Sequence, residues 1–322
     1  MSSHLFKTSK INFLKRSLIT SITCLGAIGL CPRFAIASST TTTAQNNSSP
    51  KIVTTFLPVH LFTKAVVGDT GEVDILISPG MEVHDYQATP DNAKLLADAD
   101  VLVENGLGIE EFLSGLITNA GNSQLQQIDA SEGIEVIEEE HDEHEEEEHG
   151  HHHEEGDPHV WLDPVLAQQQ VATIKDELIA IDPNNADSYR TNADAYIQQL
   201  QQLDNEFQQR LAPMAGCNFI TFHDAFAYLA QRYGLKQEAI VEIPEDSITP
   251  KDIQRVQQAA DGYQVKALLT EPRIEDKRIQ QISSDLNLPL EAIDPLESGQ
   301  TDPQYYFQAM RENLEALERA CQ

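Results

Sequence analysis

The sequence predicts an α/β protein of two lobes, each with a parallel sheet, joined by a long helix. Short apolar runs alternate with segments of helical periodicity on both sides of one long amphipathic stretch. Strands that alternate with helices favour parallel sheets covered on both faces. We expect an N-terminal lobe over 51–183, a rigid linking helix over 184–211 and a C-terminal lobe over 212–322.

The predicted strands form two similar sets of four. The first set consists of KIVTTF, VDILIS, DVLVEN and QQID, with helical segments such as DNAKLLADA between them. The second set consists of NFITFH, EAIVEI, VKALLTEP and PLEAIDP, with PKDIQRVQQAADGY among the intervening helices. Each lobe is thus expected to hold its own four-stranded sheet.

The linking helix is predicted by apolar residues at three- and four-residue steps. These are Tyr189, Ala193, Tyr196, Leu200, Leu203, Phe207 and Leu211. Pro183 can begin the helix and Pro213 stops it. At 1.5 Å per residue the helix is roughly 40 Å long, more than a small lobe needs internally.

Residues 1–37 have the features of a signal peptide. Four basic residues precede an apolar run at 18–30 that is too short to span a bilayer. Ala35-Ile36-Ala37 then provides the small-x-small pattern for cleavage before Ser38. We therefore expect a periplasmic protein whose residues 38–50, which are small and polar, form a disordered tether.

Lipid anchoring is the alternative to a cleaved, soluble form. Cys24 and Cys31 are candidate lipidation sites, but Leu30 is bulky where such a site needs a small residue. Only Cys217 and Cys321 remain after cleavage. In an exported chain they suggest one disulfide, and two free buried thiols are the alternative.

The charge balance bears on the partners of the chain. The net charge is -31, and removing residues 1–37, which carry five positive and no negative charges, makes it -36. So acidic a protein is expected to attract cations and to bind no nucleic acid. We expect a monomer.

Three histidines lie where the two sheets should present a ligand. His84 follows VDILIS by a short loop, His159 stands in DPHVWLDP, and His223 ends NFITFH. Ligands of open α/β sheets bind at the carboxyl ends of the strands, so facing lobes would bring the three together. Imidazole suits zinc, copper and nickel. Structural histidines at strand ends are the alternative.

Each of these histidines has a carboxylate one or four residues later in the chain. The three carboxylates are Asp85, Asp163 and Asp224. A metal-bound imidazole usually donates its other N–H to an acceptor. We therefore expect these side chains to orient the histidines.

Four motifs, in this order, resemble the zinc-binding components of bacterial ABC importers. They are SPGMEVHDYQATPDNAKLLADADVLVENGLGIEEF, DPHVWLDP, FITFHDAFAYLAQRYGL and LLTEPRIED, with an acidic histidine-rich insert before the second. The resemblance covers about residues 51–321. It implies two lobes, a rigid linking helix and a metal ion held in the cleft between the lobes, with metal ligands at His84, His159 and His223.

The resemblance also bears on the choice of metal. Manganese binders of the same cluster have a carboxylate where this chain has His223, and nitrogen ligands favour Zn²⁺ over Mn²⁺. Glu275 falls where those manganese binders present an aspartate, so it is the expected fourth ligand. Asp276, another carboxylate or water are the alternatives at that position.

The insert at 138–156 is expected to be a disordered loop that collects or senses zinc. It has no apolar residue with which to pack. Its auxiliary metal-binding residues are His141, His144, His149, His151, His152 and His153. The alternative is an acidic loop that only keeps the protein soluble.

These features predict a periplasmic solute-binding protein that captures Zn²⁺ and delivers it to an ABC-type permease. We expect no enzymatic activity, since the chain has no HExxH or nucleophile-elbow motif. One alternative is a zinc-dependent hydrolase that uses the same three histidines. Another is a periplasmic zinc buffer without a permease partner.

Overall fold

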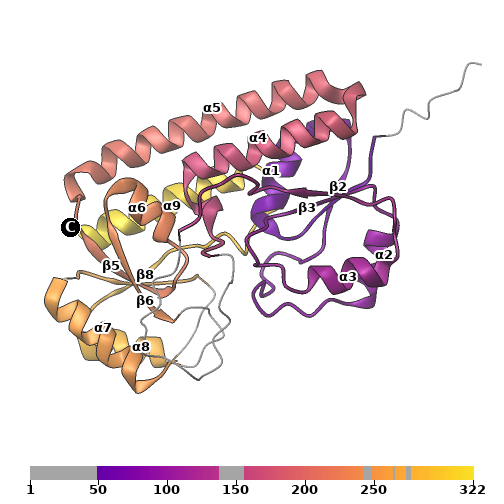
Figure 1. The fold of residues 1–322 in the computed structure, drawn as a ribbon. Helices are drawn as coiled ribbons and strands as arrows, with labels where there is room; N and C mark the ends of the chain where they lie inside the picture. Colours follow the sequence, from indigo (N-terminus) through magenta and orange to yellow (C-terminus); the bar gives the residue numbers. More distant parts are fainter. Residues whose placement is uncertain (1–48, 138–155, 242–247, 264, 273–276) are drawn as a thin grey trace, which may run out of the picture. The chain divides into compact units, whose positions relative to one another are not determined.

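Eight strands form two parallel four-stranded sheets in the computed structural model, which describes residues 49–137, 156–241, 248–263, 265–272 and 277–322 (Figure 1). The first sheet has the order β2-β1-β3-β4 and the second the order β6-β5-β7-β8. The strands are β1 (Ile52–Thr54), β2 (Val73–Ile75), β3 (Val101–Glu104), β4 (Gln126–Asp129), β5 (Asn218–His223), β6 (Lys236–Val241), β7 (Leu268–Thr270) and β8 (Leu290–Ala292). The expected fold of two parallel-sheet lobes is confirmed.

The helices lie between and after these strands. They are α1 (Leu57–Val67), α2 (Pro90–Ala97), α3 (Leu113–Ala120), α4 (Pro164–Ile181), α5 (Ala186–Leu211), α6 (Ala227–Tyr233), α7 (Pro250–Tyr263), α8 (Lys277–Leu286) and α9 (Tyr305–Cys321). Short 3₁₀ turns occupy Gly68–Thr70, Val160–Leu162, Pro183–Asn185 and Ala212–Met214. None of the helices in the described part is long and apolar enough to cross a membrane.

Local sequence signals set the starts of two helices near the functional residues. Thr89 caps α2 by accepting the N–H of Asn92, whose side chain accepts the N–H of Thr89 in return. Asp163 caps α4 by accepting the N–H of Val165. A proline occupies the first turn of both helices, where no backbone donor is needed.

The second sheet is covered on both faces. Neighbouring residues of a strand point to opposite faces, and Ile220 packs in one cluster with residues of α7 and α8. Phe219 belongs to the larger core, which includes residues of α9. Two-sided burial explains why these strands read as continuous apolar runs.

Helix α5 contacts both lobes. Asn192 donates to the carbonyl of Val66 in α1, while Asp204 accepts a hydrogen bond from Tyr233 in α6. Its apolar stripe, predicted from the sequence, is buried along the whole helix. The helix runs beside α4 and past the elements of both sheets (Figure 1).

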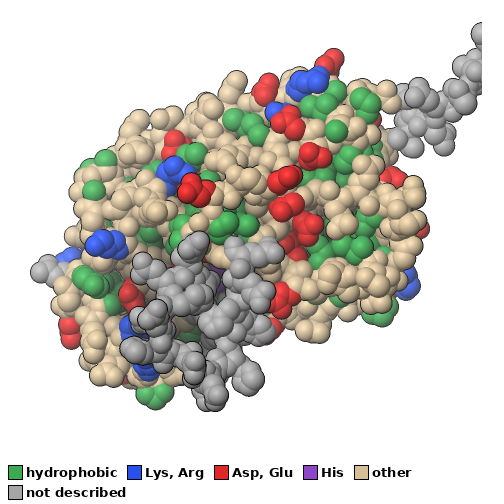
Figure 2. Space-filling view, in the orientation of Figure 1, with side chains coloured by type: hydrophobic (Ala, Val, Ile, Leu, Met, Phe, Trp, Pro, Cys, Tyr) green, Lys and Arg blue, Asp and Glu red, His purple; other side chains and the backbone are tan. Residues whose placement is uncertain are grey.

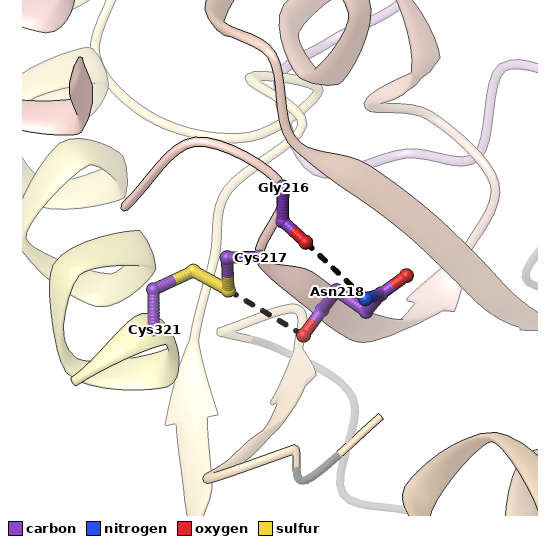
Figure 3. The surroundings of a disulfide bond; sticks show 4 residues. All are labelled: Gly216, Cys217, Asn218 and Cys321. Carbon is purple, nitrogen blue, oxygen red and sulfur yellow. Dashed lines mark hydrogen bonds between the residues drawn. A yellow bond between two sulfur atoms is a disulfide. The ribbon is translucent and has the colours of Figure 1, made fainter. Parts of the chain in front are cut away.

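A disulfide joins Cys217 to Cys321 (Figure 3). It ties the residue before β5 to the last residue of α9, with 5.8 Å between the two Cα atoms. The expected disulfide is confirmed, and the alternative of two free thiols is wrong. A covalent link between positions 104 residues apart restricts the unfolded chain strongly.

Several sequence-based predictions lie outside the described residues. They concern the signal peptide at 1–37, nearly all of the tether at 38–50, and the histidines of the acidic insert, since residues 1–48 and 138–155 are not described. They remain predictions.

Candidate metal centre

His84, His159 and His223 lie together in the folded chain. Their ring centroids are 5.4 Å apart for His84 and His159, 5.1 Å for His84 and His223, and 4.9 Å for His159 and His223. All three side chains are buried. The three residues that the sequence singled out are thus brought to one place.

The three histidines reach this place from different elements. His84 lies in the loop after β2, His159 directly precedes the 3₁₀ turn Val160–Leu162, and His223 is the last residue of β5. The first two come from the N-terminal lobe and the third from the C-terminal lobe. In each parallel sheet the carboxyl ends of the strands lie at one edge. The metal centre lies at that edge of both sheets.

Glu297 is the fourth member of the cluster. One donor atom of each residue, from His84, His159, His223 and Glu297, lies within 4.8 Å of all the others. Glu297 Oε1 is 3.7 Å from His84 Nε2. Three nitrogens and one carboxylate oxygen are a donor set that suits tetrahedral Zn²⁺.

Glu297 is not among the site residues predicted from the sequence. Glu275 is the predicted fourth ligand, and it lies outside the described residues. The signal was present, because Glu297 follows β8 by a few residues and so obeys the strand-end rule used for the histidines.

Asp157 orients His159. Its Oδ1 lies 2.7 Å from His159 Nδ1 and also accepts the backbone N–H of His159 at 2.9 Å. An ionised carboxylate only accepts, so the imidazole proton sits on Nδ1 and the lone pair remains on Nε2. Asp157 itself is anchored, since its carbonyl accepts a hydrogen bond from the hydroxyl of Tyr228 at 2.7 Å.

Glu271 faces His223 in the same way. Its Oε1 lies 3.1 Å from His223 Nδ1, and Glu271 directly follows β7, the strand next to β5. Among the described residues, His223 Nε2 has no hydrogen-bond partner. This nitrogen is therefore available to a cation.

Burial and neighbouring charge set the pKa values of the cluster. Burial, aided by His84, lowers the pKa of His223 to about 4, so that its ring is neutral at pH 7. Burial also acts to lower the pKa of His84, but Glu297, Glu82 and Glu271 outweigh it and raise that pKa. A neutral imidazole is the form that binds a metal.

Asp163, one of the three carboxylates expected to orient the histidines, has a different role. Asp163 caps α4 and pairs with Arg232 at 2.7 Å, while Asp85 and Asp224 are exposed. Asp157 and Glu271 are the carboxyl groups that contact the imidazoles of His159 and His223.

One face of the molecule carries many acidic side chains. In Figure 2, acidic side chains gather in a band across the middle of the face shown. Such a field raises the local concentration of cations.

Comparison with known proteins gives consistent matches along the chain. The model of the family described as zinc-uptake complex component A, periplasmic, matches residues 52–320. The high-affinity zinc uptake system protein ZnuA of Bacillus subtilis is 37% identical over 274 residues, which are 83% of this chain and 86% of that protein. The zinc-binding lipoprotein AdcA of Streptococcus pneumoniae is 33% identical over 297 residues, 90% of this chain but 59% of that longer protein.

Solved structures match as well. The Zn(II)-bound ZnuA-like domain of Streptococcus pneumoniae AdcA has a TM-score of 0.71 and 30% identity, covering 85% of this chain and 99% of that one. The laminin-binding protein Lmb of Streptococcus agalactiae, described as having adhesin and metal transporting activity, has a TM-score of 0.75 and 28% identity, covering 85% and 100%. By its match over 52–320, the chain belongs to the family of periplasmic zinc-uptake component A proteins.

Proposed function

We propose that this chain is a periplasmic receptor that captures Zn²⁺ between its two lobes and delivers it to an ABC-type permease. One observation carries the proposal: His84, His159, His223 and Glu297 place four donor atoms within 4.8 Å of one another. The ligands come from four separate segments, so the fold has to form before the site exists.

The donor set supports zinc as the cargo. Three imidazoles and one carboxylate are typical of Zn²⁺, whereas Mn²⁺ prefers more oxygen ligands. Four donors at about 2.0–2.1 Å from a tetrahedral ion lie roughly 3.4 Å apart, so only small side-chain shifts are needed from the present spacing. Relatives named as zinc-binding proteins add support.

The remaining parts of the proposal concern export and the acidic insert. Residues 1–37 direct the chain to the periplasm, and the mature protein acts there as a monomer. The six histidines between 141 and 153 form an auxiliary loop that binds zinc more weakly, because the loop has to be ordered for binding. Glu297 takes the fourth coordination position in place of Glu275.

Calorimetric zinc titration of residues 38–322 tests where the cargo binds. The matched variant lacks residues 138–155. We expect the deletion to keep one tight site and to lose only weaker, multiple binding. If tight binding disappears with the insert, the cluster is not the cargo site and the chain is a histidine-rich buffer.

Delivery needs a separate test. Zinc uptake is measured in cells that lack this chain and are supplied with the wild type or with His159→Ala. Restoration by the wild type alone supports the receptor. Uptake that does not depend on the chain, together with tight zinc binding in vitro, identifies a buffer without a permease partner, and hydrolysis of an ester substrate by the zinc-loaded protein identifies an enzyme.

A further inference from the structure

We propose that Trp161 is a positioning residue for the metal centre: its indole N–H holds the backbone that presents Glu297 to the three histidines. This inference rests on the proposed function. In this arrangement a residue of the N-terminal lobe supports the fourth ligand, Glu297, which belongs to the C-terminal lobe.

Trp161 is itself held firmly beside the cluster. It lies in the 3₁₀ turn directly after His159 and is 0% exposed. Its ring contacts those of His159 and Phe56, each at a centroid distance of 5.1 Å. Its carbonyl accepts a hydrogen bond from the hydroxyl of Tyr306 at 2.8 Å. Trp161 therefore moves together with the segment that carries His159.

The indole reaches across to the segment that carries Glu297. Trp161 Nε1 donates to the carbonyl of Pro295 at 2.7 Å, and the bond is buried. Only Leu296 stands between Pro295 and Glu297. Leu296 is fully buried and has φ of 64°, a left-handed conformation that a leucine rarely adopts. Such a conformation persists where the surroundings enforce it.

Two further bonds fix the same short segment. The N–H of Leu296 donates to Asp294 Oδ1 at 2.8 Å, which stabilises the turn from within. The N–H of Gly80 donates to the carbonyl of Glu297 at 2.9 Å. Gly80 lies in the loop that carries His84. The backbone around Glu297 is thus bonded to the segments of both histidines of the N-terminal lobe.

The hydrogen bond from Trp161 to Pro295 and zinc binding should be thermodynamically linked. If the bond from Trp161 to Pro295 raises zinc affinity by placing Glu297, then bound zinc strengthens that bond to the same extent. A tryptophan that only fills space would lower stability when replaced, but its effect on zinc binding would not depend on Glu297.

A double-mutant cycle on the full mature chain separates the two roles. The variants are Trp161→Phe, Glu297→Gln and the double variant, with zinc affinity measured by competition with a chelator. Phenylalanine keeps the ring contacts and removes the donor. We expect Trp161→Phe to lower zinc affinity about tenfold, as is typical for partners of metal ligands. In the Glu297→Gln background the same substitution should have no further effect.

Tyr196→Phe is the matched control. Tyr196 is buried, and its hydroxyl donates to the carbonyl of Pro303 at 2.9 Å, so the variant also removes one aromatic donor from a backbone carbonyl of the C-terminal segment. We expect unchanged zinc affinity. Thermal unfolding of every variant shows whether each one is folded.

The outcomes distinguish the two proposals. If the wild type binds no zinc tightly, the proposed function fails. If the wild type binds zinc and Glu297→Gln weakens binding, yet Trp161→Phe has no effect or the two effects are additive, the role of Trp161 is overturned.

A second measurement needs no variant. Trp161 is the only tryptophan of the chain, so the ¹⁵N-labelled protein has one indole N–H signal. We expect zinc to slow its hydrogen exchange at least several-fold. Equal exchange with and without zinc overturns the coupling even if Trp161→Phe does not fold.

Discussion

Thr55 and Glu110 in the N-terminal lobe correspond in the fold to His223 and Glu271 in the C-terminal lobe. In each lobe the first residue stands at the carboxyl end of the strand in second position, β1 or β5, and the carboxyl group follows the adjacent strand, β3 or β7. The contacts are 2.7 Å from Thr55 Oγ1 to Glu110 Oε1 and 3.1 Å from His223 Nδ1 to Glu271 Oε1.

The two carboxyl groups have similar environments but different roles. Burial raises the pKa of both to about 8. Glu110 also accepts the backbone N–H groups of Asn105 and Gly106, so it organises a loop. Glu271 instead faces an imidazole whose other nitrogen is available to a cation. A buried carboxyl group at a strand end therefore does not by itself indicate a functional site. The residue that it contacts decides its role.

Removal of His223 should have the largest effect. In His223→Ala, three donors remain, and zinc affinity at the cluster should fall more than about 1000-fold, beyond the loss typical for outer partners of a metal. His84→Ala and His159→Ala should behave alike. Thr55→Ala, the counterpart, should lower stability by about 1 kcal/mol and leave affinity unchanged. Chelator competition and thermal unfolding measure both, and a large loss of affinity in Thr55→Ala would remove the distinction between the lobes.

The disulfide lies in the C-terminal lobe and should affect the stability of the protein rather than its zinc affinity. Cys217→Ser with Cys321→Ser should lower the free energy of unfolding by about 3 kcal/mol, because the unfolded chain gains freedom. Zinc affinity should change less than about threefold, since Cys217 precedes the amino end of β5 and His223 is at its carboxyl end. Urea unfolding and zinc titration of both proteins test this, and a parallel loss of affinity would show that the tie to α9 shapes the cluster.

Glu110 should make stability depend on pH. Its pKa of about 8 lies above that of the unfolded chain, and burial is the main cause, with Glu104 adding to it. Its contribution is therefore complete below about pH 4.5 and is lost as the pH rises to about 8. Relative to Glu110→Gln, the wild type should lose roughly 4 kcal/mol across that window. Urea unfolding of both proteins at several pH values measures the difference, and parallel curves would contradict the raised pKa.

The smallest expected effect separates the two carboxyl groups directly. Glu271→Gln should lower zinc affinity about tenfold, because the imidazole of His223 loses the carboxyl group that faces its Nδ1. Glu110→Gln should leave affinity unchanged. If both variants weaken zinc binding equally, the carboxyl groups do not differ in the way that their partners suggest.

Much of this organisation follows from local patterns. Apolar runs predicted all eight strands, and the three- and four-residue spacing predicted α5 and its buried face. The rule that ligands bind at the carboxyl ends of the strands predicted that His84, His159 and His223 lie together, because parallel strands leave few places where ligands can bind.

The carboxylates were harder to predict. Asp157 precedes its histidine by two residues and is held by a turn, while Glu271 meets His223 only because β7 pairs with β5. Glu297 depends on the left-handed turn at Leu296, for which a leucine gives no signal. Contacts between distant segments and unusual backbone angles have no local pattern in the sequence.

Anomalous diffraction at the zinc edge from crystals of the zinc-loaded protein tests the central claim most directly. We expect one strong peak bonded to His84, His159, His223 and Glu297. A strong peak that none of these histidines contacts would contradict the assignment of the cluster as the site of the cargo, and a fourth ligand from Glu275 would contradict the role of Glu297.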